Sequence, residues 1–226
     1  MTLPLPPKPR SLTPSGEFDG DDGSWSTFMV NIAGDSEGQG QDFKVLISTS
    51  SSVTLVPAQT GWCSTDDCAK SRGIMSTING RQALGLDVDQ STAWQKEGLY
   101  QLPFADAYWW SPELLLLNRN DTLRGEWGST TVGLGRASKE SITIGDQYVA
   151  MYYLEDLFLG SLGLSEGVIG PNGGAQKSTF FNTLTSLEII PSHSYGYTAG
   201  AIYRKSTSVS PLHSYFVLLT RPHIQC

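Results

Sequence analysis

The sequence predicts an all-β protein, and three observations support that class. The 226 residues include 24 glycines and 12 prolines, which is typical of a chain with many turns. Several runs alternate apolar and polar residues with the period of two that β-strands require. Long amphipathic helical patterns are few. The 39% apolar content suffices for a sizeable core in one domain or slightly more.

The first expected elements lead into a hairpin. Residues 1–16 are rich in proline and are expected to be extended or disordered. Trp25–Ile32 alternates apolar and polar residues and is expected to form a half-buried strand. The glycine-containing segment Ala33–Gln41 would then turn the chain back into a second strand over 42–47.

Five consecutive hydroxyl residues, Ser48 to Ser52, separate two apolar runs. The run over 42–47 and the run over 53–56 both predict buried strands. Five hydroxyl side chains do not belong in a core, so the turn must present them to solvent, to neighbouring backbone or to a ligand. This strand, turn and strand form the candidate functional site.

The middle of the chain carries weaker patterns. The polar segment Gln59–Gln90 is expected to be irregular surface. Trp94–Leu117 is apolar without a clean period, which leaves two alternatives. A strand and a short helix packed on the sheet are favoured over a membrane-touching patch, because the run is short and contains Asp106 and Glu113.

The later elements are a hairpin arm and one helix. Ile142–Ala150 alternates as a strand does. Thr179–Leu187 predicts a short helix that ends at Pro191. Its apolar residues at helical spacing are Phe180, Phe181, Leu184 and Leu187.

Charge and composition exclude several classes of partner. The formal charge of -7 and the pI near 4.9 argue against nucleic acid or an anionic membrane surface, because binding through counterion release needs clustered Lys and Arg. No run of about 18 apolar residues exists, so no membrane span is expected in this chain. The first nine residues contain four prolines, which exclude the apolar helix of a signal peptide.

No metal or other cofactor is expected. The three histidines lie far along the chain and have no zinc-site spacing with the paired acidic residues at 66–67. These histidines are His193, His213 and His223. The acidic pairs at 21–22 and 66–67 are assigned to solvated loops.

Ser48–Pro57 resembles the first active-site loop of the pepsin family of aspartic peptidases (peptidase A1). The family pattern is Asp-Thr-Gly-Ser-Ser, two residues, then Trp-Val-Pro. The matching residues are Thr49, Ser51, Ser52, Val56 and Pro57. Ser48 stands at the position of the catalytic aspartate, Ser50 replaces the glycine, and Leu55 replaces the tryptophan.

Further markers follow in the order that the resemblance implies. Cys63 and Cys68 are similar to the family's small disulfide loop, although two free thiols remain the alternative. Pairing them would leave Cys226 without a partner. Leu159–Leu164 is similar to the glycine-containing strand that crosses beneath the family's active site. The matches run from about residue 18 to 204 and look like the fungal type.

The family's flap hairpin should precede Val132. Gly125 and Gly128 align with it, whereas Asp121 falls near the position of the flap tyrosine. Trp127 would lie under the flap or in the core, and the core is favoured. The candidates for lining a substrate cleft, if the family's cleft is present, are Ser51, Trp127 and Gly128.

The resemblance implies a pepsin-like acid protease fold, reduced to the amino-terminal lobe of a normally bilobal, β-barrel-like domain. The expected divisions are a leader over 1–16, the lobe over 17–204 and a non-homologous tail over 205–226, explained by truncation or an incomplete gene model. The resemblance also implies an extracellular or cell-surface location. The sequon at Asn120 is compatible with that location. We then expect the start of the chain to lie inside a longer precursor or the gene model to be incomplete.

Aspartic peptidases hydrolyse peptides with two carboxylates that share a proton around a water molecule. A serine hydroxyl has no accessible anionic form near neutral or acidic pH, so Ser48 can hold a water but cannot take its proton. No Asp-(Thr/Ser)-Gly sequence supplies the second carboxylate. Serine hydrolysis is disfavoured because the Gly-x-Ser-x-Gly elbow is absent. We expect an inactive aspartic endopeptidase relative. The alternatives are a peptide-binding or cell-surface module and a fragment without function.

Overall fold

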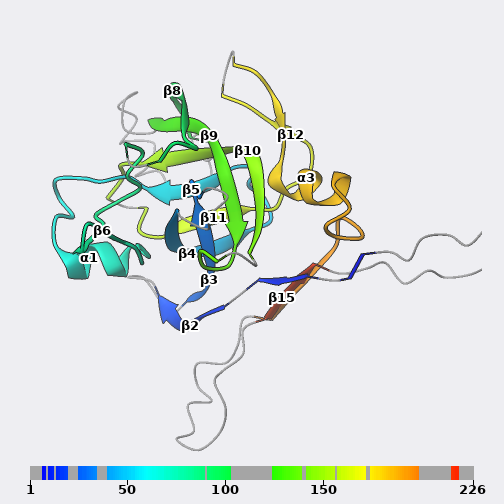
Figure 1. The fold of residues 1–226 in the computed structure, drawn as a ribbon, viewed down its shortest axis with the longest axis horizontal. Helices are drawn as coiled ribbons and strands as arrows, with labels where there is room; N and C mark the ends of the chain where they lie inside the picture. Colours follow the sequence, from blue (N-terminus) through cyan, green and yellow to red (C-terminus); the bar gives the residue numbers. More distant parts are fainter. Residues whose placement is uncertain are drawn as a thin grey trace, which may run out of the picture.

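The computed structural model describes residues 7–8, 10–12, 14–19, 25–34, 40–89, 91–102, 124–138, 141–155, 157–171, 174–198 and 215–218. An eight-stranded mixed sheet dominates this part of the chain (Figure 1). Its strand order is β2 (Pro14–Asp19), β3 (Trp25–Ile32), β4 (Gln41–Ser48), β11 (Gly160–Gly163), β5 (Thr54–Pro57), β10 (Ile142–Tyr152), β9 (Arg124–Leu134) and β8 (Gln95–Gln101). The all-β class is confirmed.

The sheet also closes on itself. In addition to its neighbours in the order, β3 pairs antiparallel with β9, and Asn31 lies opposite Gly133. The strands from β3 through β4, β11, β5 and β10 to β9 therefore form a barrel, as a closed sheet does. The strands β2 and β8 continue the sheet beyond the point of closure.

The predicted hairpin around Ala33–Gln41 is confirmed, and Ile32 lies opposite Gln41 at its base. Residues 35–39 lie outside the described part. The prediction of a half-buried β3 was wrong, because the strand is buried on both faces. Thr27 and Asn31, on its polar face, are satisfied by side-chain hydrogen bonds to Asp19 and Asp42, respectively. The alternating polar residues of β3 therefore do not face solvent, because carboxylates of the neighbouring strands cover them.

The prediction of irregular surface over Gln59–Gln90 was only partly right. A short helix, α1 (Asp66–Ser71), interrupts it, and a two-stranded ribbon of β6 (Thr77–Ile78) and β7 (Arg81–Gln82) follows. Several side chains of the segment are buried: Cys63, Ala69, Arg72, Ile74, Ala83 and Leu86. A helix of six residues is too short to produce a clear period in the sequence.

The predicted helix at Thr179 is confirmed as α3 (Phe180–Ser186). The Thr179 hydroxyl caps it by accepting the backbone N–H of Asn182 at 3.4 Å. The helix ends before the predicted Pro191, and Leu187 is 58% exposed rather than part of the core. The ribbon of β12 (Val168–Ile169) and β13 (Lys177–Ser178) precedes α3.

A small sheet joins both ends of the described chain. Its order is β1 (Arg10–Leu12), β15 (Tyr215–Leu218) and β14 (Tyr195–Thr198). The strand β1 falls within the predicted leader over 1–16, and β15 falls within the predicted tail over 205–226. Both segments thus contribute backbone pairing, and the boundaries at 16 and 204 stay predictions.

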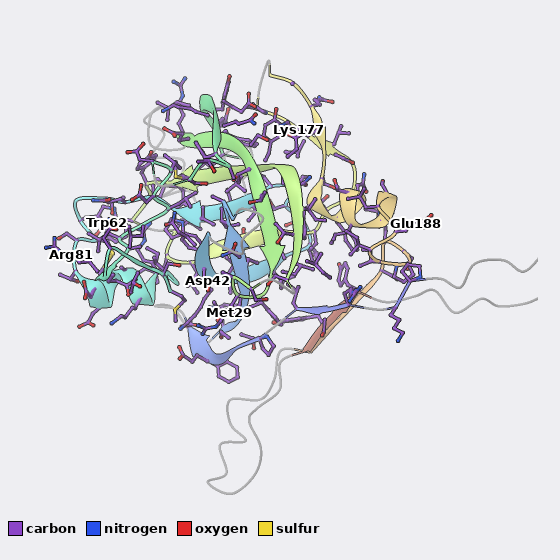
Figure 2. The ribbon with its side chains drawn as sticks, in the orientation of Figure 1. Met29, Asp42, Trp62, Arg81, Lys177 and Glu188 are labelled. Carbon is purple, nitrogen blue, oxygen red and sulfur yellow. A yellow bond between two sulfur atoms is a disulfide. The ribbon has the colours of Figure 1, made fainter. Side chains whose placement is uncertain are left out.

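Two hydrophobic clusters fill the interior. The larger one gathers residues from β3, β4, β9, β10, β11 and α3. The smaller one surrounds Trp127 and includes Val53, Leu55, Leu102, Tyr148, Ala150 and Tyr152. Figure 2 shows side chains on both flanks of the sheet, with Trp62 on the α1 side and Lys177 on the α3 side. Among the described residues no helix is long and apolar enough to cross a membrane.

Candidate functional site

The candidate site is the Ser48–Ser52 turn, and a strand from far along the chain supports it. β11 lies between β4 and β5, the two strands that the turn connects. It runs parallel to β4, with Gly163 opposite Ser48, and antiparallel to β5, with Ser161 opposite Leu55. The segment Leu159–Leu164 thus contributes β11, which pairs with both strands that the turn connects.

The glycines of β11 permit this close approach. A Cβ atom at Gly163 would lie 2.6 Å from the Val53 carbonyl oxygen and 2.8 Å from that of Ser51. A Cβ at Gly160 would lie 2.4 Å from the Leu55 carbonyl oxygen. Because these neighbours are backbone atoms, a larger residue would force the strands apart. The glycine spacing in the sequence thus has a steric cause.

Some of the hydroxyl groups of the turn form hydrogen bonds with the backbone of the turn itself. The Ser48 Oγ accepts the backbone N–H of Ser51 at 3.2 Å, and the Ser51 Oγ donates to the Val53 carbonyl oxygen at 3.0 Å. Thr49 and Ser50 are exposed. Of the alternatives left open by the sequence, neighbouring backbone accounts for Ser48 and Ser51, and solvent accounts for Thr49 and Ser50.

Two further hydrogen bonds hold the turn against the segment that follows β11. The backbone N–H of Leu164 donates to the Ser48 carbonyl oxygen, and that of Ser165 donates to the Ser51 carbonyl oxygen, both at 2.9 Å. The turn is therefore held at both of its ends. A catalytic group at position 48 would be well positioned by this scaffold.

The chemistry at position 48 is that of a neutral hydroxyl. Among the described residues, no hydrogen bond or ion pair joins a carboxylate to Ser48 or Ser51. A hydroxyl of this kind can donate and accept hydrogen bonds with a water molecule. It cannot act as the base that takes a proton from that water.

The other predicted cleft residues lie in the core. Trp127 is fully buried in the smaller cluster, where its ring meets Tyr148 edge-on with a centroid separation of 6.1 Å. Gly128 lies against the Trp94 ring, which a Cβ atom would approach to 2.2 Å. The core alternative for Trp127 therefore holds. The glycosylation candidate Asn120 lies outside the described residues.

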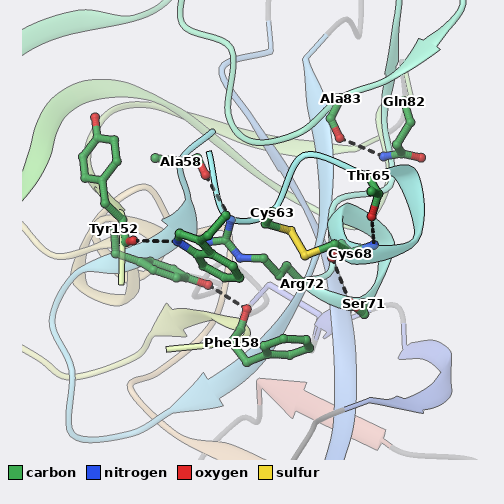
Figure 3. Close-up of a disulfide and its surroundings, with 12 residues drawn as sticks. Ala58, Cys63, Thr65, Cys68, Ser71, Arg72, Gln82, Ala83, Tyr152 and Phe158 are labelled. Atoms are coloured by element: carbon green, nitrogen blue, oxygen red, sulfur yellow. Dashed lines mark hydrogen bonds between the residues drawn. A yellow bond between two sulfur atoms is a disulfide. The ribbon is translucent and has the colours of Figure 1, made fainter. Parts of the chain in front are cut away.

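The predicted disulfide is confirmed between Cys63 and Cys68, whose Cα atoms are 5.5 Å apart (Figure 3). The bridge ties the chain before α1 to its first turn. Thr65 caps the same helix through its hydroxyl, which accepts the Cys68 N–H at 3.3 Å. Cys226 lies outside the described residues.

Three charged clusters were missed by sequence reasoning. The first joins Ser129, Asp146 and Lys177, where the Ser129 Oγ donates to the Asp146 carboxylate at 2.8 Å. Hydrogen bonds from Lys177 and Ser129 lower the pKa of Asp146 below its ordinary value of 3.8. The second surrounds Lys44 and the third is Arg72, both buried. Their partners come from distant elements, so no local pattern marks them.

No metal site gathers in the described part of the chain, where no group of three His, Cys, Asp or Glu could hold an ion. The His193 ring packs against Phe181 in a tilted arrangement with a centroid separation of 5.4 Å, and its Nδ1 lies 3.8 Å from the Glu166 carboxylate. His213 and His223 lie outside the described residues. The acidic residues at 66–67 are exposed, as expected, although they occupy the first turn of α1 rather than a loop.

No protein-family model matches this chain, and no curated protein matches it.

Proposed function

We propose that this chain is an amino-terminal lobe of pepsin-like architecture whose active-site loop has lost its acid, and that it hydrolyses no peptides. The insertion of β11 between β4 and β5, directly beneath the Ser48 turn, supports this proposal more than any other observation. The confirmed Cys63–Cys68 bridge and the glycines of β11 agree with the resemblance.

The absence of activity follows from the residue at position 48. General acid-base catalysis accelerates peptide hydrolysis only when one carboxylate takes a proton from the attacking water while a partner carboxyl donates one. Ser48 offers a hydroxyl that already accepts the Ser51 N–H. Pairing two copies of the lobe would bring two serines together and would not restore the acid.

A cleavage assay at acidic pH, with and without an aspartic-peptidase inhibitor, tests this proposal. The unmodified chain should give no inhibitor-sensitive turnover. The Ser48→Asp, Ser50→Gly variant restores the Asp-Thr-Gly loop, so that two paired copies bring two carboxylates together. It should therefore gain inhibitor binding in calorimetry, whereas the matched Ser48→Asn, Ser50→Gly control should not. Inhibitor-sensitive turnover by the unmodified chain would disprove the loss of activity.

A second function, from another class, is the binding of extended peptides. β8 is the last strand in the order of the main sheet, and most of its residues are exposed, including Leu99 at 61%. An edge strand of this kind can pair with the backbone of an extended peptide.

Peptide binding by edge pairing can be separated from other modes of binding with modified ligands. A fluorescent peptide that can pair with β8 should bind, and a copy N-methylated at alternate residues should not, because it lacks the donors for the ladder. A Leu99→Asp variant should weaken binding of the first peptide. Equal binding of both peptides would count against edge pairing.

We also infer an extracellular or cell-surface location. The Cys63–Cys68 bridge supports this inference, because disulfides persist in oxidising compartments and are rare in the cytosol. Digestion of the native protein with a glycosidase should reduce its mass if Asn120 carries a glycan. An unmodified Asn120 together with free thiols in the native protein would argue against export.

A further inference from the structure

Arg72 is a buried cation that the Ser48 turn does not use. It caps the carboxyl end of α1, where the Arg72 N–H donates to the Cys68 carbonyl oxygen at 3.1 Å and the Gly73 N–H donates to that of Lys70 at 3.0 Å. Its side chain is fully buried and runs past the disulfide toward Tyr152 (Figure 3). The Nη1 atom donates to the Ala58 carbonyl oxygen at 3.1 Å.

The other two guanidinium nitrogens have no acceptor in hydrogen-bond geometry within the described part of the chain. Nε and Nη2 are both buried without a partner, and no carboxylate of the described residues forms an ion pair with Arg72. Burying a charge in this state is unfavourable unless it is paired and hydrogen-bonded. Burial lowers the pKa of Arg72, and the Tyr152 hydroxyl offsets this only in part.

Two aromatic rings cover the faces of the guanidinium without meeting its edge. The Arg72 Cζ lies 4.6 Å from the Trp62 ring centroid and 5.5 Å from that of Tyr152. Such contacts attract a cation through the ring faces and provide no acceptor for in-plane N–H groups. The Tyr152 hydroxyl donates to the Phe158 carbonyl oxygen at 3.1 Å. The Tyr152 oxygen interacts with the guanidinium strongly enough to raise the pKa of Arg72 in part, but Nε and Nη2 have no acceptor in hydrogen-bond geometry among the described residues.

The two unpaired atoms define the ligand chemistry. Nε and Nη2 form one edge of the guanidinium, whose parallel N–H groups match the two oxygens of a carboxylate. We propose that the Nε and Nη2 edge of Arg72 binds a small carboxylate beneath the Trp62 indole. Water would satisfy the two donors but would leave the charge uncompensated, and a halide would meet the two donors with a single atom.

Trp62 is the side chain that can admit this ligand. It is 38% exposed, and its Nε1 donates to the Tyr153 carbonyl oxygen at 3.3 Å. Its backbone is held by the neighbouring Cys63, which the disulfide anchors to α1. The indole can therefore turn outward about its side-chain bonds while the surrounding backbone stays in place. Binding at Arg72 does not depend on the function proposed above.

Thermal unfolding in sodium acetate and in sodium chloride, at pH 7 and equal ionic strength, tests the site. At 100-fold above its dissociation constant, acetate should raise the Tm by about 5 to 10 °C relative to chloride. The Arg72→Met variant should lose this difference. The matched Arg81→Met variant, which removes an exposed arginine, should retain it. An equal Tm in both salts, or an acetate effect that persists in Arg72→Met, would overturn the proposal.

A direct measurement remains available if Arg72→Met does not fold. In the ¹⁵N spectrum of the unmodified protein, titration with acetate should shift the Arg72 Nε resonance and leave the Arg81 resonance in place. A Trp62→Ala variant removes the indole that covers the site. Acetate should still shift the Arg72 Nε resonance in this variant. An Arg72 resonance that stays unchanged at saturating acetate would refute carboxylate binding.

Two sources of carboxylate are separated by a further titration. A short peptide with a free carboxyl terminus is compared with the same peptide carrying a terminal amide. A shift of the Arg72 resonance with the free acid alone identifies a peptide terminus as a ligand. A response to acetate without a response to either peptide restricts the site to small molecules. Equal responses to the acid and the amide would contradict recognition of the carboxylate.

Discussion

Two buried cations in this protein have opposite surroundings. Lys44 on β4 is 6% exposed and forms ion pairs with Glu17 and with Asp19, the latter at 3.0 Å. Arg72 after α1 is fully buried and has no ion pair within the described residues. Burial lowers the pKa of Lys44, but its hydrogen bonds to the two carboxylates outweigh burial and raise it, whereas the pKa of Arg72 is lowered.

The comparison separates a structural charge from a charge with unused binding capacity. The carboxylates that pair with Lys44 both belong to β2, so the charge fastens this edge strand to the barrel. One donor of Arg72 reaches a carbonyl oxygen, and two aromatic rings cover the faces of its guanidinium. A buried charge is tolerated when its partners are present, and the missing partner of Arg72 is what motivates a ligand there.

The largest expected effect comes from breaking the compensated pair. Asp19→Ala should lower the free energy of unfolding by about 3 to 5 kcal/mol, because it leaves a buried ammonium with one exposed partner. Urea unfolding at pH 7 measures the change. Glu17→Gln is the matched control, and it should cost less than about 1 kcal/mol because Glu17 is exposed. Equal effects of the two variants would show that Lys44 depends on Glu17 as much as on Asp19.

The disulfide beside Arg72 should have the next largest effect. Replacing Cys63 and Cys68 together by serine should lower the free energy of unfolding by about 2 kcal/mol, the value expected for so short a loop. The same change should make the Trp62 indole more accessible to a neutral quencher, because the backbone next to it is released. Unchanged quenching would show that the bridge does not hold Trp62 over Arg72.

Removing Arg72 and removing Lys44 should change the free energy of unfolding in opposite directions. In a buffer without carboxylates, Arg72→Met should raise the free energy of unfolding by about 1 kcal/mol, because it removes an unpaired buried charge and costs one hydrogen bond. Lys44→Met should lower it, since two carboxylates lose their partner. Urea midpoints of the two variants provide the measurement. A loss of stability in both would mean that Arg72 is compensated after all.

The smallest effect concerns pH. The pKa of Lys44 is raised above its ordinary value of 10.5, so its stabilising contribution is complete below pH 10.5 and is lost as the pH rises through the folded pKa. The stability difference between the unmodified protein and Lys44→Met should therefore stay constant from pH 7 to about 10 and shrink above that. Lys70→Met, which removes an exposed lysine, is the control. A constant difference up to pH 12 would contradict the shift.

Strands were predictable where their pattern is local. The alternation over 142–150 and the apolar run over 42–47 predict β10 and β4 to within about two residues at each end. The helix α1 was missed, because six residues with a polar exterior do not repeat a period. The burial of β3 on both faces was also missed, because Asp19 covers Thr27 and belongs to another strand.

The candidate site could be predicted in part. The five hydroxyl residues marked the Ser48 turn, and the two neighbouring cysteines marked the disulfide. The core position of Trp127 was favoured but not settled, since an aromatic residue between glycines suits either a core or a cleft. No local sequence pattern predicts the burial of Lys44 and Arg72 or the groups that surround them.

The sequence by itself determined the strand pattern, the hydroxyl turn and the absence of an acid at position 48, because these depend on residues next to one another in the chain. Tertiary structure alone decided that β11 enters between β4 and β5, that Lys44 meets two carboxylates and that Arg72 meets none among the described residues. Such pairings join residues far apart in sequence, and their energy depends on burial, which exists only once the barrel has closed.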